Sequence, residues 1–130
     1  MIHSRDAYLE TVKILEQEDA NKVHLHLWGG KNEMEAIKQN GWYISVGPII
    51  ERSKTHRKIV KSLPIDRIML ETDSPWFGGK DVEGKTIRGD PRNIKIPAEK
   101  IAEELHLNFE DVWKICGQNA VRFYNLPIKL

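Results

Sequence analysis

The chain has 130 residues, a length that suits one compact domain with a real hydrophobic core. It is too short for a complete eight-stranded α/β barrel, which needs about 250 residues. Its 20 basic and 19 acidic residues give a formal net charge of +1, so the overall charge does not mark a nucleic-acid-binding protein. One cysteine excludes a disulfide framework, and the sequence shows no signal-peptide pattern and no apolar run of about 18 residues. We therefore expect a cytoplasmic protein with no membrane partner.

Short apolar runs alternate along the chain with amphipathic stretches, a pattern that predicts repeated strand-helix units. The first unit has only the end of a strand, just before His3, and then a helix over residues 6–17. The second has a strand over 23–27, a Trp-Gly-Gly loop and a helix over 32–39. The third has a strand over 42–46 and a basic helix over 52–62. The fourth strand ends at Asp73.

A polar loop over residues 78–93 follows, and its length favours a functional or mobile segment. Pro97 suits the first turn of a helix that reaches Leu105, and Asn108 suits the N-cap of the last helix. The fold class is thus α/β, with four parallel strand-helix units and a C-terminal helix, which is half of an eightfold barrel. In such a barrel the basic helix over 52–62 lies on the outer ring, and we expect its charges to be solvated.

Three metal-binding side chains stand at the carboxyl ends of the predicted strands, where parallel strands share a common mouth. They are His3, His26 and Asp73, the last within the stretch RIMLETDSPWF. Two imidazoles and a carboxylate suit Zn²⁺, Mn²⁺ or Fe²⁺, and Mg²⁺ less readily, because Mg²⁺ prefers oxygen ligands. The alternative for Asp73 is that it caps the following turn.

His24 lies two residues before His26 and projects from the same face of the strand. A His-X-His pair on one strand is able to bind a metal by itself. The alternative, which we favour, is that His24 lies one layer deeper and hydrogen-bonds to a backbone carbonyl or to a metal ligand.

Five segments of the sequence resemble the motifs of the TatD-type metal-dependent deoxyribonucleases, which belong to the amidohydrolase-like metal hydrolases. The resemblance covers essentially the whole chain, and the motifs occur in the same order and at similar separations. The segments are 2-IHSRDA-7, 26-HLWGG-30, 64-PIDRIMLETDSP-75, 92-RNIKIP-97 and 118-QNAVRFYNL-126.

The resemblance implies one partial domain over residues 1–130, formed by strands five to eight of a TIM-type (β/α)8 barrel. It also implies a nuclease that uses a divalent metal (Mg, Mn or Zn) to hydrolyse phosphodiester bonds. His3, His26 and Asp73 match the family's metal ligands, and Asp73 would also take a proton from the attacking water.

Further roles follow from the same resemblance. Glu71 is expected to accept hydrogen bonds inside the barrel, behind the ligands, or to be a buried structural acid. Arg5 is expected to bind a substrate phosphate or to hold a neighbouring carboxylate. Trp28 and Trp76, near the mouth, are expected to stack on a base or to pack at its rim.

The family carries further ligands, a His-X-His pair on its first strand and a glutamate on its fourth, and both precede the part of the barrel that this chain matches. Three explanations are therefore possible for a chain that lacks these ligands. A homodimer or a separate amino-terminal half completes an active barrel; the chain is a truncated enzyme; or it is a non-catalytic half-barrel that keeps a partial metal site. The expected substrate is DNA, cut as an exonuclease cuts it, or a small phosphoester.

Overall fold

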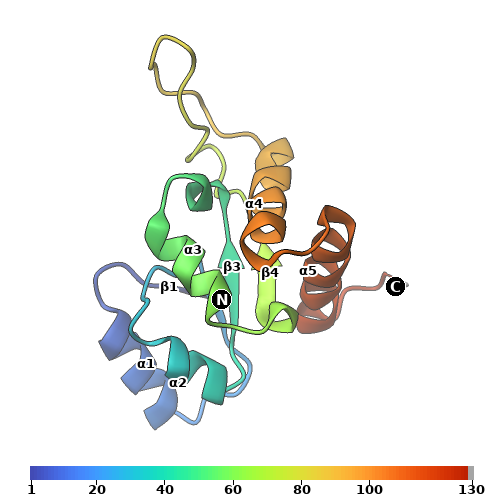
Figure 1. Cartoon of the computed structure of the whole chain (residues 1–130). Helices are drawn as coiled ribbons and strands as arrows, with labels where there is room; N and C mark the ends of the chain where they lie inside the picture. Colours follow the sequence, from blue (N-terminus) through green and yellow to red (C-terminus); the bar gives the residue numbers. More distant parts are fainter. Residues whose placement is uncertain (129–130) are drawn as a thin grey trace.

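The computed structural model describes residues 1–128 and shows one parallel sheet with helices packed against it (Figure 1). The four strands follow chain order, β1-β2-β3-β4, and every neighbouring pair is parallel. Their bounds are Ile2–His3 for β1, His24–His26 for β2, Tyr43–Val46 for β3 and Ile68–Leu70 for β4. The register pairs His3 with His26, so two of the predicted site residues lie side by side. The expected half-barrel topology is confirmed.

The helices also follow the predicted order. They are α1 (Tyr8–Gln17), α2 (Met34–Gln39), α3 (Lys54–Lys61), α4 (Lys95–Leu105) and α5 (Phe109–Tyr124), with short 3₁₀ turns η1 (Pro48–Glu51), η2 (Ile65–Arg67) and η3 (Pro91–Ile94). The side chain of Asn108 accepts a hydrogen bond from the backbone N–H of Asp111 at 2.8 Å, which confirms the predicted N-cap of α5. Helix α4 begins at Lys95 and therefore includes Pro97 in its first turn, where a missing N–H costs nothing.

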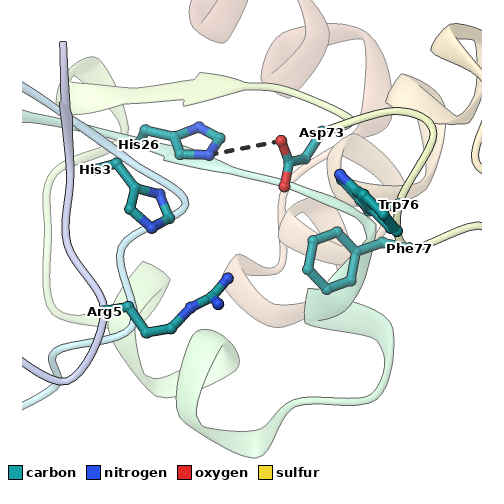
Figure 2. Close-up of a pocket in the computed structure, with 6 residues that line it drawn as sticks. All are labelled: His3, Arg5, His26, Asp73, Trp76 and Phe77. Carbon is teal, nitrogen blue, oxygen red and sulfur yellow. Dashed lines mark ion pairs between the residues drawn. The ribbon is translucent and has the colours of Figure 1, made fainter.

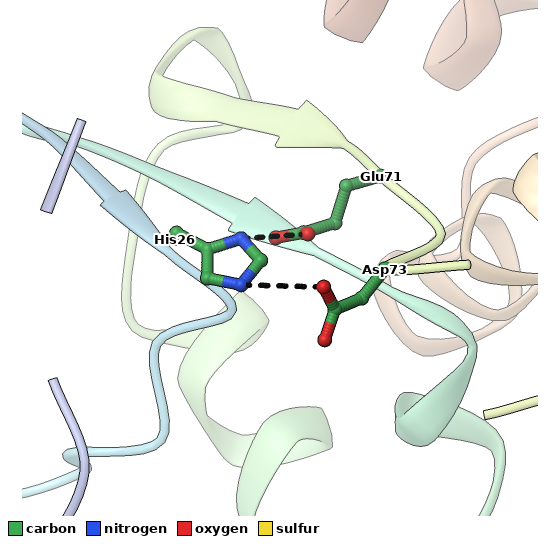
Figure 3. Close-up of side chains that lie close together, drawn as sticks. All are labelled: His26, Glu71 and Asp73. Atoms are coloured by element: carbon green, nitrogen blue, oxygen red, sulfur yellow. Dashed lines mark ion pairs between the residues drawn. The ribbon is translucent and has the colours of Figure 1, made fainter. Parts of the chain in front are cut away.

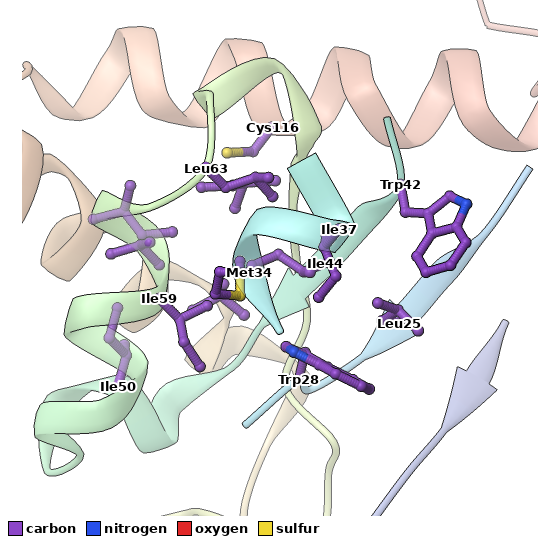
Figure 4. Close-up of a cluster of buried hydrophobic side chains, with 14 of the residues drawn as sticks. Leu25, Trp28, Met34, Ile37, Trp42, Ile44, Ile50, Ile59, Leu63 and Cys116 are labelled. Atoms are coloured by element: carbon purple, nitrogen blue, oxygen red, sulfur yellow. The ribbon is translucent and has the colours of Figure 1, made fainter. Parts of the chain in front are cut away.

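The strands send alternate side chains to opposite faces of the sheet. Leu25 and Ile44 are buried in the core that the helices cover (Figure 4), and so are Val46 and Ile68. The residues between them have mostly polar side chains and lie on the other face. They are His24, His26, Tyr43, Ser45 and Met69. The helices thus bury one apolar face of the sheet, and the opposite face carries the polar groups of the candidate site.

The end of α5 reaches the polar face. The hydroxyl of Tyr124 lies 2.5 Å from Nδ1 of His24, and the ring of Phe123 packs edge-on against His24 and obliquely against Tyr43. This aromatic contact places the last helix beside the strand residues that lie beneath the predicted mouth.

The predicted long loop after β4 extends away from the body of the molecule (Figure 1). Within it Lys80 and Thr86 form an antiparallel bridge, and the Asp81 carboxylate accepts two backbone hydrogen bonds that close the turn. None of the helices found in residues 1–128 is both long and apolar enough to cross a membrane.

Candidate metal centre

A histidine at the end of β2 and two carboxylates beyond the end of β4 converge (Figure 3). One possible ligand atom from each of His26, Glu71 and Asp73 lies within 4.8 Å of the others. Oε2 of Glu71 lies 2.8 Å from Nδ1 of His26, and Oδ1 of Asp73 lies 3.7 Å from Nε2. The two ring nitrogens of His26 therefore face two different carboxylates.

Glu71 is held by the neighbouring strands. Its Oε1 accepts hydrogen bonds from the backbone N–H of Leu27, at 2.8 Å, and from the hydroxyl of Ser45, while Oε2 meets His26. A carboxylate at Nδ1 fixes the ring orientation and favours a proton on that nitrogen, which leaves the lone pair of Nε2 free for a metal. This geometry agrees with the expected role of Glu71 as a hydrogen-bond acceptor inside the barrel.

Two residues at the strand ends adopt left-handed backbone conformations. Asp73 has φ 52°, which aspartate tolerates, and Leu27 has φ 45°, which is unusual for a bulky residue. The hydrogen bond from Leu27 to Glu71 holds this strained position in place. The positive φ of Leu27 changes the direction of the backbone directly after His26.

His3 and Arg5 lie across an open cavity from Asp73 (Figure 2). The cavity has a volume of about 590 Å³, and its lining residues are His3, Arg5, His26, Asp73, Trp76 and Phe77. The ring centroids of His3 and His26 are 5.6 Å apart. His3 thus lies at the mouth as expected, although the tight group of three is His26 with the two carboxylates.

His24 lies one layer deeper than His26, as we favoured. Its side chain is buried, Nδ1 meets the hydroxyl of Tyr124, and burial, reinforced by the charges of the amino terminus and His26, lowers the pKa of His24 to about 4. Its hydrogen-bond partner is thus a tyrosine, where we expected a carbonyl or a metal ligand.

The structure corrects the expectation that Trp28 contacts substrate. Trp28 is 1% exposed, its indole N–H donates to the carbonyl of Gly30 at 2.8 Å, and its ring packs edge-on against Tyr8. A ring buried on both faces has no surface for a base. Trp76, the other tryptophan expected near the mouth, is 68% exposed and lines the cavity.

A second correction concerns the basic helix, α3. Its lysines are solvated, but His56 is half-buried and turns toward the mouth, and Arg57 lies 3.5 Å from Glu104 of α4. The sequence signal that separates His56 from its neighbours is Ser53, three residues earlier, which caps the helix and binds the imidazole.

The fold and this residue group define a class: α/β-barrel proteins with a histidine and carboxylate site at the carboxyl ends of the strands. A model of the family described as "TatD related DNase" matches residues 1–125, and the chain belongs to this family.

Two curated relatives illustrate the similarity. The human protein named deoxyribonuclease TATDN3 is 38% identical over 125 residues, which are 95% of this chain and 44% of that protein. The Bacillus subtilis protein named uncharacterized metal-dependent hydrolase YabD is 34% identical over 131 aligned positions, which cover 97% of this chain and 51% of that protein. The chain spans about half the length of these relatives.

Solved structures support the fold. A TatD homologue from Escherichia coli, YJJV, superposes with a TM-score of 0.82 at 22% identity and covers 96% of this chain and 49% of its own. A TatD family hydrolase from Entamoeba histolytica superposes with a TM-score of 0.76, and the match covers 93% of this chain and 48% of that structure. The four parallel units thus correspond to about half of such a barrel.

Proposed function

We propose that the chain is the carboxyl-terminal half of a TatD-type metal-dependent hydrolase that cleaves phosphodiester bonds of DNA, acting from strand ends. Family membership supports this reaction, as do the names of relatives that cover nearly all of the chain. The observation that carries the proposal is His26, fixed at Nδ1 by Glu71 and facing Asp73 with Nε2 at 3.7 Å.

The residues fit a divalent cation. Nε2 of His26 and the Asp73 carboxylate are separated by more than a hydrogen bond, and the His3 ring lies beside them. We propose that these three side chains hold the metal, with Zn²⁺ or Mn²⁺ suited best by the mixed nitrogen and oxygen donors. When bound, such an ion supplies Lewis-acid charge that makes water a nucleophile near neutral pH and neutralises the phosphoryl oxygens.

Side chains of this chain would supply the proton acceptor and bind the substrate. The Asp73 carboxylate accepts no hydrogen bond from a side chain in residues 1–128, so it is free to accept a proton from the attacking water. Arg5 brings a guanidinium to the cavity for a phosphate, and the exposed indole of Trp76 offers a surface for a base.

We further propose that a second polypeptide, either another copy of this chain or a separate amino-terminal half, completes the barrel. In the described sheet β1 and β4 are the edge strands, and edge strands favour pairing with another chain. The polar face of the sheet, which carries His26, would then become the barrel interior. A dimer or a stable complex in light scattering would support this, and a persistent monomer that binds no amino-terminal half of a relative would contradict it.

Hydrolysis of single-stranded DNA in Mn²⁺, Mg²⁺ or Zn²⁺ tests the reaction, with Asp73→Asn beside the parent. We expect the substitution to abolish cleavage. Asp19→Asn is a matched control, because Asp19 has a similar backbone conformation, φ 49° against 52°, and is exposed outside the cavity. Equal activity of parent and Asp73→Asn would contradict the proposal. Cleavage of linear but not circular single strands would support action from ends.

A further inference from the structure

A smaller cavity of about 170 Å³ lies beside the candidate metal centre. It shares His3, Arg5 and Phe77 with the larger cavity, so the two spaces are adjacent and have walls in common. Its inner wall is formed by Tyr8 of α1 and by His56 of α3. We call this space the His56 cavity. A substrate in the larger cavity therefore has a second space within reach.

Ser53 sets the orientation of His56 and accommodates the tautomer with a proton on Nε2. The Ser53 oxygen accepts the backbone N–H of His56 at 3.3 Å and lies 2.8 Å from Nδ1. Ser53 is able to donate its hydroxyl proton to Nδ1 while it accepts the backbone N–H, and in that tautomer the imidazole proton is on Nε2. Burial lowers the pKa of His56, partly opposed by the Leu27 backbone, so the ring is neutral at physiological pH.

The Nε2 atom of His56 is buried and has no hydrogen-bond partner in residues 1–128. A buried N–H without a partner is costly, and in a native protein such a group requires an explanation, such as a bound water, ion or ligand. The Leu27 backbone lies close enough to raise the pKa of His56 but forms no hydrogen bond of good geometry with Nε2, so this donor is incompletely satisfied in the described part of the chain.

Gly29 allows two polar groups to approach the same place. A Cβ at this position would lie 2.6 Å from Oη of Tyr8 and 3.9 Å from Cε1 of His56, so only a glycine leaves room for the tyrosine hydroxyl there. Together with the Arg5 guanidinium, the cavity presents an imidazole N–H, a phenol and a cation. None of its described lining residues carries a carboxylate.

We propose that the His56 cavity binds a second phosphate group of the substrate, next to the phosphate that reacts at the metal centre. Nε2–H of His56, the Tyr8 hydroxyl and Arg5 donate to its oxygens. A phosphate suits these groups because it is anionic and offers several acceptors to donors that come from different directions. This assignment rests on the proposed function, since successive phosphates are the repeating feature of a nucleic-acid strand, but phosphate binding is measurable without turnover.

The first test is a titration of the metal-free chain with inorganic phosphate, followed through the ¹⁵N-coupled imidazole signals of His56. We expect a proton on Nε2 in the free chain and a saturable shift of this signal. His56→Leu should weaken phosphate binding about tenfold to a hundredfold, the value of a hydrogen bond to a charged group. His56→Gln should retain most of the affinity, because its amide N–H reaches a similar position. Tyr8→Phe, which keeps the ring, should weaken binding by a smaller factor.

Lys58→Gln is the matched control. It removes a charge from the same helix at an exposed position outside the cavity, so it should leave the titration unchanged. Circular dichroism checks that each variant is folded, and Tyr8→Phe decides the matter if His56→Leu does not fold. Unchanged phosphate affinity in the folded His56→Leu or Tyr8→Phe variant would overturn the proposal.

A second test compares substrates with one and with two phosphodiester groups, a dinucleotide and a trinucleotide without terminal phosphates. We expect His56→Leu to raise KM about tenfold or more for the trinucleotide and to leave the dinucleotide unchanged. An equal change for both would overturn the assignment to a second phosphate. If no chain variant hydrolyses either substrate, the proposed reaction fails, whereas the phosphate titration still decides the His56 cavity.

Discussion

Glu71 holds the imidazole of His26: its Oε2 lies 2.8 Å from Nδ1, while the other ring nitrogen, Nε2, faces Asp73 at 3.7 Å (Figure 3). The same carboxylate is tied to the β2 end through Leu27 and to β3 through Ser45. The orientation of His26 thus depends on three strands. His26 itself ends β2, Ser45 lies in β3, and Glu71, the acceptor that fixes the ring, directly follows β4.

This relationship predicts the effect of Glu71→Gln. An amide N–H in place of Oε2 would face Nδ1 and favour the tautomer protonated at Nε2, which lacks a lone pair for the metal. We expect Zn²⁺ or Mn²⁺ affinity to fall about 10- to 100-fold, measured by calorimetry. Glu110→Gln, at an exposed position of α5, is the control and should leave the affinity unchanged. Parent-like affinity in Glu71→Gln would contradict the role of Glu71.

Tyr124→Phe tests the contact between α5 and the polar face of the sheet. The variant removes the hydroxyl that lies 2.5 Å from Nδ1 of the buried His24. Because a buried polar atom then loses its partner, we expect the free energy of unfolding to fall by about 1–3 kcal/mol in urea titrations. Tyr43→Phe should cost less, since its hydroxyl meets Arg67 only at 3.5 Å. Equal costs for the two would argue against a specific role of the Tyr124 hydroxyl.

Asn119 fastens α5 to the strand that leads to the site. Its side chain is fully buried, and Nδ2 donates to the carbonyls of Ile65 and Ile68, each at 2.8 Å. Asn119→Ala leaves two carbonyl acceptors without this partner, so we expect a loss of about 2–5 kcal/mol in the free energy of unfolding. Gln118→Ala, the adjacent helical position, should change stability by less than about 0.5 kcal/mol. A similarly small effect at Asn119 would show that these bonds do not stabilise the fold.

Cys116 predicts a pH dependence of stability at alkaline pH. Burial raises the pKa of its thiol from 9.0 to about 12, so the thiol ionises in the unfolded chain before it ionises in the folded one. The unfolded state then binds fewer protons, and the contribution is fully present below pH 9 and is lost as pH rises toward 12.

Within this window the free energy of unfolding falls with pH at a slope that approaches about 1.4 kcal/mol per pH unit. Urea unfolding of the parent and of Cys116→Ala, from about pH 8, below this window, to about pH 10.5, within it, isolates the contribution of the thiol. The alanine variant should be less stable at pH 8 because of the cavity it creates, yet lose less stability as pH rises. Parallel slopes would contradict the raised pKa.

Local patterns in the sequence predicted the four strand-helix units, the N-cap at Asn108 and the residues at the strand ends. Apolar periodicity depends only on which face of a strand or helix is buried, and capping depends on neighbours three residues away. The arrival of His3, His26 and Asp73 at one mouth followed from the rule that parallel strands end on the same side of a sheet.

Only the tertiary structure decided which side chains the strand ends and helices bury. The hydrogen bond between Leu27 and Glu71 joins residues 44 positions apart, and that between Asn119 and Ile68 spans 51. No local pattern distinguishes Trp28, which the core encloses, from Trp76, which remains exposed, because their burial depends on how distant helices pack. The same reason explains His56. The sequence of its helix predicts a solvated basic face, and only the packing of α3 against the mouth, where His56 comes near Gly29, turns this imidazole inward.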